Sequence, residues 1–89
     1  MEVLEQSGSI QILLALGKKG PLTLKELKKR VDASMVSMVT AIPKLEEIGL
    51  VEERLEDKFP RRKIISLTEK GEIVAEKLNE IERLIKLIE

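Results

Sequence analysis

The stretch Leu22–Val51, LTLKELKKRVDASMVSMVTAIPKLEEIGLV, decides the fold of this 89-residue chain. Thr23 and Glu26 have the spacing of a capping box, in which each side chain binds the backbone N–H of the other residue. This motif predicts a helix over about residues 24–30. After a short turn, apolar residues at three- and four-residue steps predict a longer helix over about residues 35–48. The stretch therefore predicts two helices joined by a tight turn.

The longer helix is expected to have a buried face and an outward face. Ser34 suits the N-cap position, and Gly49 suits the left-handed position just after a helix. The buried face is expected to hold Val36, Val39, Ile42 or Pro43, Leu45 and Ile48. The outward face is expected to hold Ser34, Ser37, Met38, Thr40, Ala41 and Lys44. Because Pro43 cannot donate to the Val39 carbonyl, a kink or a second short helix is expected there.

The rest of the chain predicts smaller elements around this pair of helices. In chain order they are a frayed tail or short helical lead-in at 1–6, a helix capped by Ser7 or Ser9 and ended by 17–20, a strand stub at 22–23, strands at 50–55 and 63–67, and a last helix from Thr68. The expected fold class is mostly α with a small β-hairpin. One domain over residues 1–89 is expected, with a core at 8–67 and a C-terminal helix at 68–89.

The composition excludes several classes of protein. The chain has no cysteine and no histidine, which removes disulfides, thiolate metal sites and the usual general base near neutral pH. No apolar run reaches the roughly 18 residues that span a bilayer, and the N-terminus lacks the features of a signal peptide. No motif typical of an active site is present. We therefore expect a cytoplasmic protein that is not an enzyme and needs no metal, cofactor or membrane.

Charge is sorted along the chain although sixteen basic and sixteen acidic residues cancel. Residues 18–44 carry seven basic and two acidic residues, and residues 58–63 carry four basic and no acidic residues. Such blocks create a local positive field whatever the net charge. The excess of charged residues over Asn, Gln and Cys is typical of thermophile proteins, although a lysine-rich mesophile protein has a similar composition.

Four short motifs occur in an order that is typical of one group of regulators. They are Leu24–Leu27, Val31–Ser34, Lys44–Val51 and Ile65–Gly71. Together they resemble the winged helix-turn-helix of MarR-like and ArsR-like bacterial and archaeal transcription regulators, over about residues 8–75. The resemblance implies that the hairpin is the wing and that the protein binds double-stranded DNA.

The resemblance also implies that Ser34–Lys44 is the recognition helix, which enters the major groove. The residues expected to face bases are Ser34, Met35, Ser37, Met38, Thr40 and Ala41. Lys25 and Lys44 are expected beside the groove. Because this face has no Arg, Asn or Gln, bidentate contacts to guanine and adenine are absent, and low intrinsic sequence specificity is expected. The alternative is that Met35 and Met38 lie in the core or contact a protein.

The wing tip is the second expected DNA contact. Its basic residues are Lys58, Arg61, Arg62 and Lys63. These side chains are expected to contact phosphates or a narrow minor groove. Phe59, the only aromatic residue, lies at the same tip. A wedge between bases is one interpretation of Phe59, but we expect it to fold back onto the body.

The last helix has the spacing of a coiled-coil seam. The residues expected at a dimer interface are Val74, Leu78, Ile81, Leu84, Ile85 and Ile88. About 22 residues at 1.5 Å each span about 33 Å, so the far half extends beyond what a small body can cover. The far half is therefore expected to pair with a second copy, with an antiparallel arrangement favoured. The alternative is a monomer in which this helix packs only on its own domain.

Together these patterns predict a homodimeric winged-helix transcription regulator. Two alternatives remain open: a winged helix that binds a protein partner, and an architectural protein that binds DNA without sequence preference. The sequence specifies neither the target DNA nor a small-molecule effector.

Overall fold

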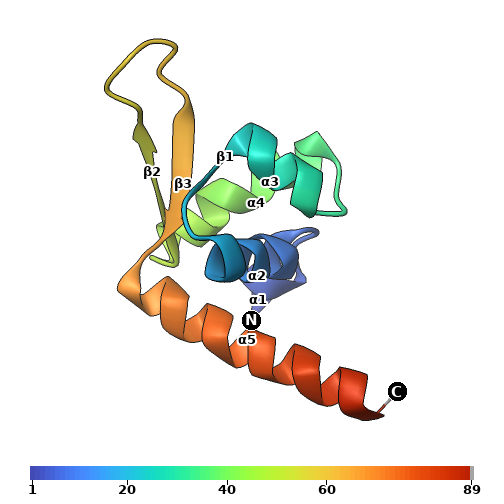
Figure 1. Cartoon of the computed structure of the whole chain (residues 1–89). Helices are drawn as coiled ribbons and strands as arrows, with labels where there is room; N and C mark the ends of the chain where they lie inside the picture. Colours follow the sequence, from blue (N-terminus) through green and yellow to red (C-terminus); the bar gives the residue numbers. More distant parts are fainter. Residues whose placement is uncertain (89) are drawn as a thin grey trace.

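The computed structural model describes residues 1–88 and confirms a mostly helical chain with a small sheet. Figure 1 labels its elements: α1 (Glu2–Glu5), α2 (Ser9–Lys19), β1 (Leu22–Thr23), α3 (Leu24–Arg30), α4 (Met35–Glu47), β2 (Val51–Leu55), β3 (Lys63–Leu67) and α5 (Glu69–Ile88). The wing and α3 lie on one side of the molecule, and α5 lies on the opposite side (Figure 1). This arrangement separates two surfaces that have different roles below.

The helix-turn-helix forms through the predicted caps. The Thr23 hydroxyl accepts from the Glu26 N–H at 3.2 Å, and the Glu26 carboxylate accepts from the Thr23 N–H at 2.9 Å. These hydrogen bonds lower the pKa of Glu26 below its ordinary value. The Ser34 hydroxyl accepts from the Ser37 N–H at 3.1 Å at the start of α4. Local side-chain chemistry therefore sets where both helices begin.

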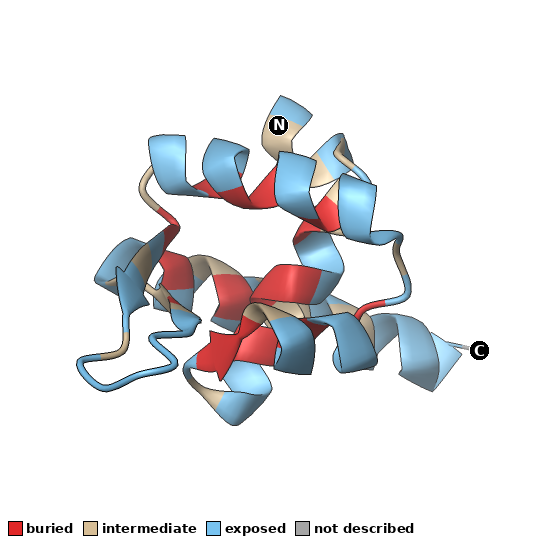
Figure 2. Cartoon of the chain, turned by 90° about the horizontal axis from the view of Figure 1, so that it is seen from above, coloured by how far each residue is buried: buried red, intermediate tan, exposed pale blue. Residues whose placement is uncertain are grey.

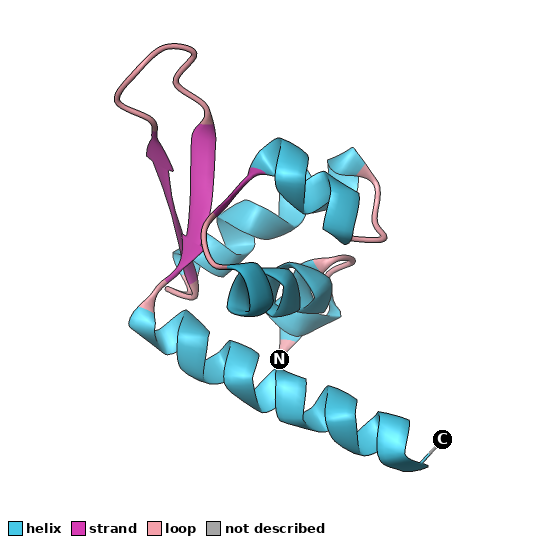
Figure 3. Cartoon of the chain, in the orientation of Figure 1, coloured by secondary structure: helices cyan, strands magenta, loops and turns pink. Residues whose placement is uncertain are grey.

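The sheet is antiparallel, with strand order β1-β3-β2. In its register Leu22 pairs with Ile65, and Val51 pairs with Leu67. Strands β2 and β3 form the predicted hairpin, whose loop projects away from the helices (Figure 3). The hairpin is thus placed as a wing beside the helix-turn-helix.

The core lies between α2, α3, α4 and the sheet, as the red segments of Figure 2 show. Its largest fully buried apolar side chains are Ile12, Leu13, Leu16, Leu27, Met38, Leu45, Val51 and Ile65. Each helix contributes only one face. The packing therefore decides which face of each helix remains available for a partner.

The face of α4 that packs into the core agrees only in part with the predicted one. Met38 and Ala41 are fully buried, so the prediction that they face outward is wrong. Val36 is 77% exposed and Val39 is 52% exposed, so their predicted burial is also wrong. The core-facing positions are Met38, Ala41, Ile42 and Leu45, which confirms the predicted burial of Ile42 and Leu45, whereas Ile48 is 40% exposed and its predicted burial is wrong. The core-facing positions have the same three- and four-residue spacing as the predicted set, so the pattern fits two faces equally well.

Pro43 lies inside the single helix α4, so the predicted second short helix is absent. The side chain of Pro43 is exposed, and the residue whose carbonyl it leaves free, Val39, is half exposed. The ring therefore does not disturb core packing, and solvent can serve the freed carbonyl. Only one helical hydrogen bond is missing as a result.

The start of α2 also differs from the prediction. Neither Ser7 nor Ser9 is the cap, because Gly8 occupies the N-cap position and forms no side-chain hydrogen bond. Ser9 is the first residue of the helix and is fully buried. Gly8 has a φ of 86°, a backbone conformation that glycine adopts without a steric penalty.

Helix α5 packs on α2 through its near half. The Thr68 hydroxyl caps it by accepting from the Gly71 N–H at 3.0 Å. Gly71 is buried, and a Cβ at this position would collide with the Leu50 carbonyl oxygen. Farther along, Lys18 on α2 pairs with Glu82 at 3.1 Å, which lowers the pKa of Glu82. The rest of α5 continues past α2 (Figure 1).

Candidate nucleic-acid interface

A basic groove lies between α3, the start of α4 and the wing. Its basic lining residues are Lys25, Lys28, Lys29, Arg62 and Lys63. Thr23, Leu24, Glu26 and Met35 complete the lining, and the volume is about 870 Å³. Two predicted positive blocks, far apart in the chain, are thereby brought onto one surface. We call this surface the basic groove.

Arg62 is held by an ion pair within the wing. Its Nε atom donates to Glu56 Oε1 at 2.6 Å, and the Arg62 backbone N–H donates to the same oxygen at 3.1 Å. The guanidinium hydrogen bond lowers the pKa of Glu56, and the carboxylate raises the pKa of Arg62. Arg62 therefore presents a positive edge that is partly neutralised by its neighbour.

The other predicted basic residues fall into two groups. Lys44 donates to Gln6 Oε1 at 2.8 Å, which directs this side chain toward the N-terminal segment. Within residues 1–88, Lys25, Lys58, Arg61 and Lys63 form no ion pair, and all four are exposed. These four side chains are therefore the ones that are most available to an incoming anion.

The hydroxyl groups of α4 are largely used by the helix itself. Thr40 Oγ1 donates to the Val36 carbonyl at 2.8 Å. Ser34 Oγ donates to Ser37 Oγ at 3.1 Å while it caps the helix. Of the six residues predicted to face bases, these three hydroxyl residues and Met35 reach the surface at least in part, whereas Met38 and Ala41 do not.

An exposed apolar stripe on α4 was missed from the sequence. Val36, Val39 and Pro43 lie three and four residues apart and are all exposed. We call them the outer stripe of α4. A second apolar repeat at 38, 41, 42 and 45 was the available signal, because a helix with two such repeats exposes one of them when only one face packs.

The wing tip exposes its aromatic residue. Phe59 is 93% exposed, so the expectation that it folds back onto the body is wrong. The hairpin loop projects away from the helices (Figure 3). Lys58 and Arg61 beside it are exposed as well.

The predicted interface residues of α5 divide into two sets. Val74 and Leu78 are partly buried and pack against the core of their own chain. Ile81, Leu84, Ile85 and Ile88 are each more than half exposed and lie at spacings of three, one and three residues. We call these four residues the apolar end of α5. The near half of the helix thus packs on its own protomer, and the apolar end has no partner within residues 1–88.

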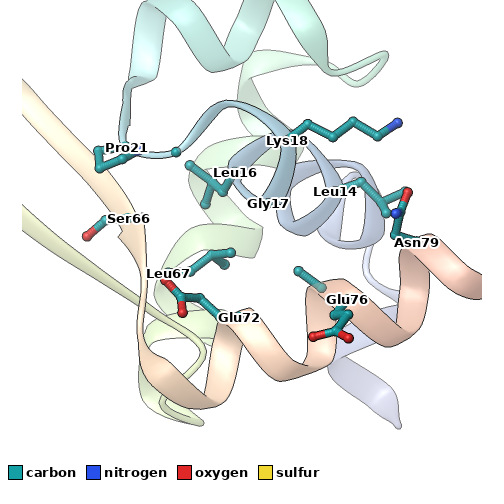
Figure 4. A pocket seen from close by; sticks show the side chains of 12 residues that line it. Leu14, Leu16, Gly17, Lys18, Pro21, Ser66, Leu67, Glu72, Glu76 and Asn79 are labelled. Atoms are coloured by element: carbon teal, nitrogen blue, oxygen red, sulfur yellow. The ribbon is translucent and has the colours of Figure 1, made fainter.

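A cavity of about 410 Å³ lies between α2, β3 and α5 (Figure 4). Leu14, Gly17 and Lys18 contribute from α2, and Glu76 and Asn79 contribute from α5. The cavity therefore lies where α5 meets α2 and the sheet.

Among residues 1–88, no helix combines the length and apolar character needed to cross a membrane.

Comparisons with known proteins agree with this architecture. The ytfH protein from Salmonella typhimurium has the same fold at 23% identity, with a TM-score of 0.83 over 97% of this chain and 77% of that chain. The structure of NadR in complex with 4-hydroxyphenylacetate matches at 25% identity and a TM-score of 0.79, over 97% of this chain and 65% of that chain. AF1382 from Archaeoglobus fulgidus matches at 26% identity and a TM-score of 0.75, over 88% and 87%.

No curated protein sequence matches the chain. A family model does: the winged helix DNA-binding domain matches residues 7–71, nearly the span over which the motifs resemble winged-helix regulators. These residues include the helix-turn-helix, the wing and the start of α5. The chain therefore belongs to the winged helix DNA-binding domain family.

Proposed function

We propose that this protein is a homodimeric transcription regulator that binds double-stranded DNA. The observation that carries the proposal is the basic groove, which places five basic side chains of α3 and the wing beside the exposed start of α4. A surface of this kind attracts phosphates on both sides of a helix that fits the major groove. In this arrangement α4 enters the groove while the wing contacts the flanking backbone.

The basic side chains have distinct roles in this arrangement. Lys25 and Lys63 bind phosphates beside the recognition helix, and Lys58 and Arg61 bind the backbone farther along the wing. Arg62 contributes less than a free arginine, because Glu56 occupies its guanidinium. Phosphate contacts position the protein and provide most of its affinity, but they carry no sequence information.

The apolar end of α5 supports a dimer. Four large aliphatic side chains on one stripe are exposed in the protomer, and pairing with a second copy would remove them from water. Because α5 lies opposite the wing (Figure 1), a dimer through this helix leaves both basic grooves open. A two-fold dimer of this kind contacts two half-sites about one helical turn, or a multiple of it, apart.

The salt dependence of duplex binding tests the proposal. If a dimer neutralises about six to eight phosphates, the logarithm of the association constant falls with the logarithm of salt concentration with a slope of about −5 to −7. Fluorescence anisotropy with a labelled duplex measures this slope between low and physiological salt. A flat dependence, or no duplex binding at low salt, contradicts the proposal.

A protein partner is the competing occupant of the exposed α4 face, because the outer stripe of α4 is apolar. The two functions are separated by variants of the basic groove. Lys25→Gln with Lys63→Gln weakens duplex binding if the groove holds phosphates, and leaves it unchanged if α4 binds a protein. Capture of a partner that depends on Val36 and not on Lys63 supports the protein-binding function.

A further inference from the structure

We infer that α4 selects DNA sites through the 5-methyl groups of thymine, which the outer stripe of α4 contacts in the major groove. The inference rests on the proposed DNA binding and specifies what the recognition helix recognises. It follows from three features of the exposed face: the apolar side chains that it presents, the hydroxyl groups that it does not offer, and the charges that border it.

The outer stripe has a length that suits stacked bases. Val36 and Pro43 are seven residues apart, which is about 10 Å along a helix that rises 1.5 Å per residue. Stacked bases of one strand are 3.4 Å apart, so the stripe spans about three base steps. Val36 is 77% exposed and Val39 is 52% exposed, so both side chains can reach a ligand without rearrangement of the core.

The polar groups on the same face offer few hydrogen bonds to bases. The Thr40 hydroxyl donates its proton to the Val36 carbonyl, and the Ser34 hydroxyl donates to Ser37. Only Ser37 keeps a hydroxyl proton for another acceptor, and its side chain is partly buried. Direct readout by hydrogen bonds is therefore a minor part of what this helix can do.

The charges that border the stripe favour a polyanion over a protein partner. Met35, at the start of α4, lines the basic groove together with Lys25 and Lys63. Lys63 and Glu53 both line the hollow that holds Val39 and Pro43. Lys63 therefore lies beside both the basic groove and the outer stripe, where it can bind a phosphate next to the apolar side chains. The apolar group that a DNA major groove presents on its floor is the thymine methyl group.

The test compares thymine with uracil, which lacks only the 5-methyl group. A duplex is first selected from a randomised pool with the full chain, and the winning site is then made with uracil in place of thymine. Thymine is expected to be enriched in the selected sites. Each methyl group that is removed from the interface is expected to weaken binding about fourfold, so a dimer that contacts one methyl in each half-site loses about fifteenfold.

Matched variants assign the effect to the outer stripe. Val36→Thr together with Val39→Thr keeps the side-chain shape, replaces two methyl groups by hydroxyl groups, and alters no core position. This double variant is expected to bind thymine and uracil duplexes with nearly equal affinity. Ile10→Thr is the control, since Ile10 is also exposed but lies on α2, outside α3, α4 and the wing. It is expected to keep the full discrimination.

Two results overturn the inference while leaving DNA binding intact. One is equal affinity of the native protein for thymine and uracil duplexes, with the steep salt dependence retained. The other is undiminished discrimination in the double valine variant. Absence of duplex binding at low salt contradicts both this inference and the proposed function.

Discussion

The outer stripe of α4 and the apolar end of α5 are both exposed apolar surfaces, and they differ in the charges around them. The outer stripe of α4 adjoins the basic groove, in which five basic side chains outnumber one carboxylate. The apolar end of α5 lies in a segment, residues 76–88, with three acidic and three basic residues. An apolar surface beside positive charge suits DNA, whose phosphates are negative and whose major groove presents thymine methyl groups. An apolar surface amid balanced charge suits a copy of itself.

A single protomer leaves both apolar surfaces exposed to solvent. The inner face of α4 and the near half of α5 pack against the core of their own protomer. No element within residues 1–88 remains to cover the other two surfaces. We propose that each surface has its own partner, DNA for the outer stripe of α4 and a second copy of the chain for the apolar end of α5.

Charges placed on the apolar end of α5 are expected to have the largest effect. Ile81→Glu with Ile85→Glu places carboxylates in a buried dimer interface, where they have no partners. Light scattering at micromolar concentration is expected to change from a dimer to a protomer of 10.1 kDa. DNA affinity is expected to fall about a hundredfold or more, because two linked half-site contacts become independent.

Lys77→Glu is the control for this change, since Lys77 is exposed on the same helix but lies outside the apolar end. It introduces the same residue and is expected to keep the dimer. If native protein scatters as a protomer, or if the double variant remains a dimer, the assignment of α5 as the interface fails.

The two faces of α4 are separated by a pair of truncations. Met38→Ala is expected to lower the free energy of unfolding by about 2–5 kcal/mol, because it leaves a cavity in a fully buried site. Val36→Ala is expected to change it by less than about 0.5 kcal/mol, because the side chain is exposed. Urea denaturation followed by circular dichroism measures both. Similar decreases for the two variants would mean that α4 packs with a different face.

Removal of one charge from the border of the outer stripe is expected to have a smaller effect. Lys63→Gln removes one lysine–phosphate contact per protomer. Duplex binding at physiological salt is therefore expected to weaken about fivefold for each contact that is lost. The salt slope is expected to become shallower by about one for each such contact. Lys77→Gln on α5 is the matched control and is expected to leave both values unchanged. Anisotropy titrations at several salt concentrations measure the slope, and an unchanged slope for Lys63→Gln would place the DNA elsewhere.

The smallest expected effect concerns the ion pair in the wing. Glu56→Gln frees the Arg62 guanidinium and removes a negative charge near the DNA, so duplex affinity is expected to rise about two- to threefold at low salt. Glu56→Asp is the control, because it keeps the charge. A lower affinity in Glu56→Gln would show that the pair holds Arg62 in its binding geometry.

The same pair has a defined pH dependence. Because Arg62 lowers the pKa of Glu56 in the folded protein, the pair contributes stability above the ordinary pKa of a glutamate and loses it as pH falls through the lowered value. The stability of Glu56→Gln is therefore expected to decrease less on acidification than the stability of the native protein. Thermal melts between neutral and acidic pH compare the two proteins.

The sequence predicted the features that depend on near neighbours. The capping box of Thr23 and Glu26, the Ser34 cap and the left-handed Gly49 all formed as expected, because each needs only residues within one helical turn. The order of elements and the hairpin followed in the same way. These local signals were enough to indicate the winged-helix resemblance before any packing was known.

The sequence was a poor guide to features that depend on distant residues. Gly71 reads as a weak helix residue, yet its lack of a side chain lets α5 approach the Leu50 carbonyl, which is twenty-one residues away in sequence. Phe59 is a large apolar residue that was expected to pack on the body, yet it is 93% exposed at the tip of the wing. Likewise, Arg62 reads as a free phosphate ligand, and only the fold shows that Glu56 lies beside it.

Helix α4 shows both what the local sequence determines and what only tertiary packing determines. Residues 34–47 determine that a helix forms, that Ser34 caps it, and that its outward surface lacks the side chains for bidentate base contacts. They also carry two apolar repeats, one at 36, 39 and 43 and the other at 38, 41, 42 and 45. Periodicity cannot choose between them, because both have helical spacing. Packing against α2 and the sheet buries the second repeat, and this leaves the first to face the partner of the helix.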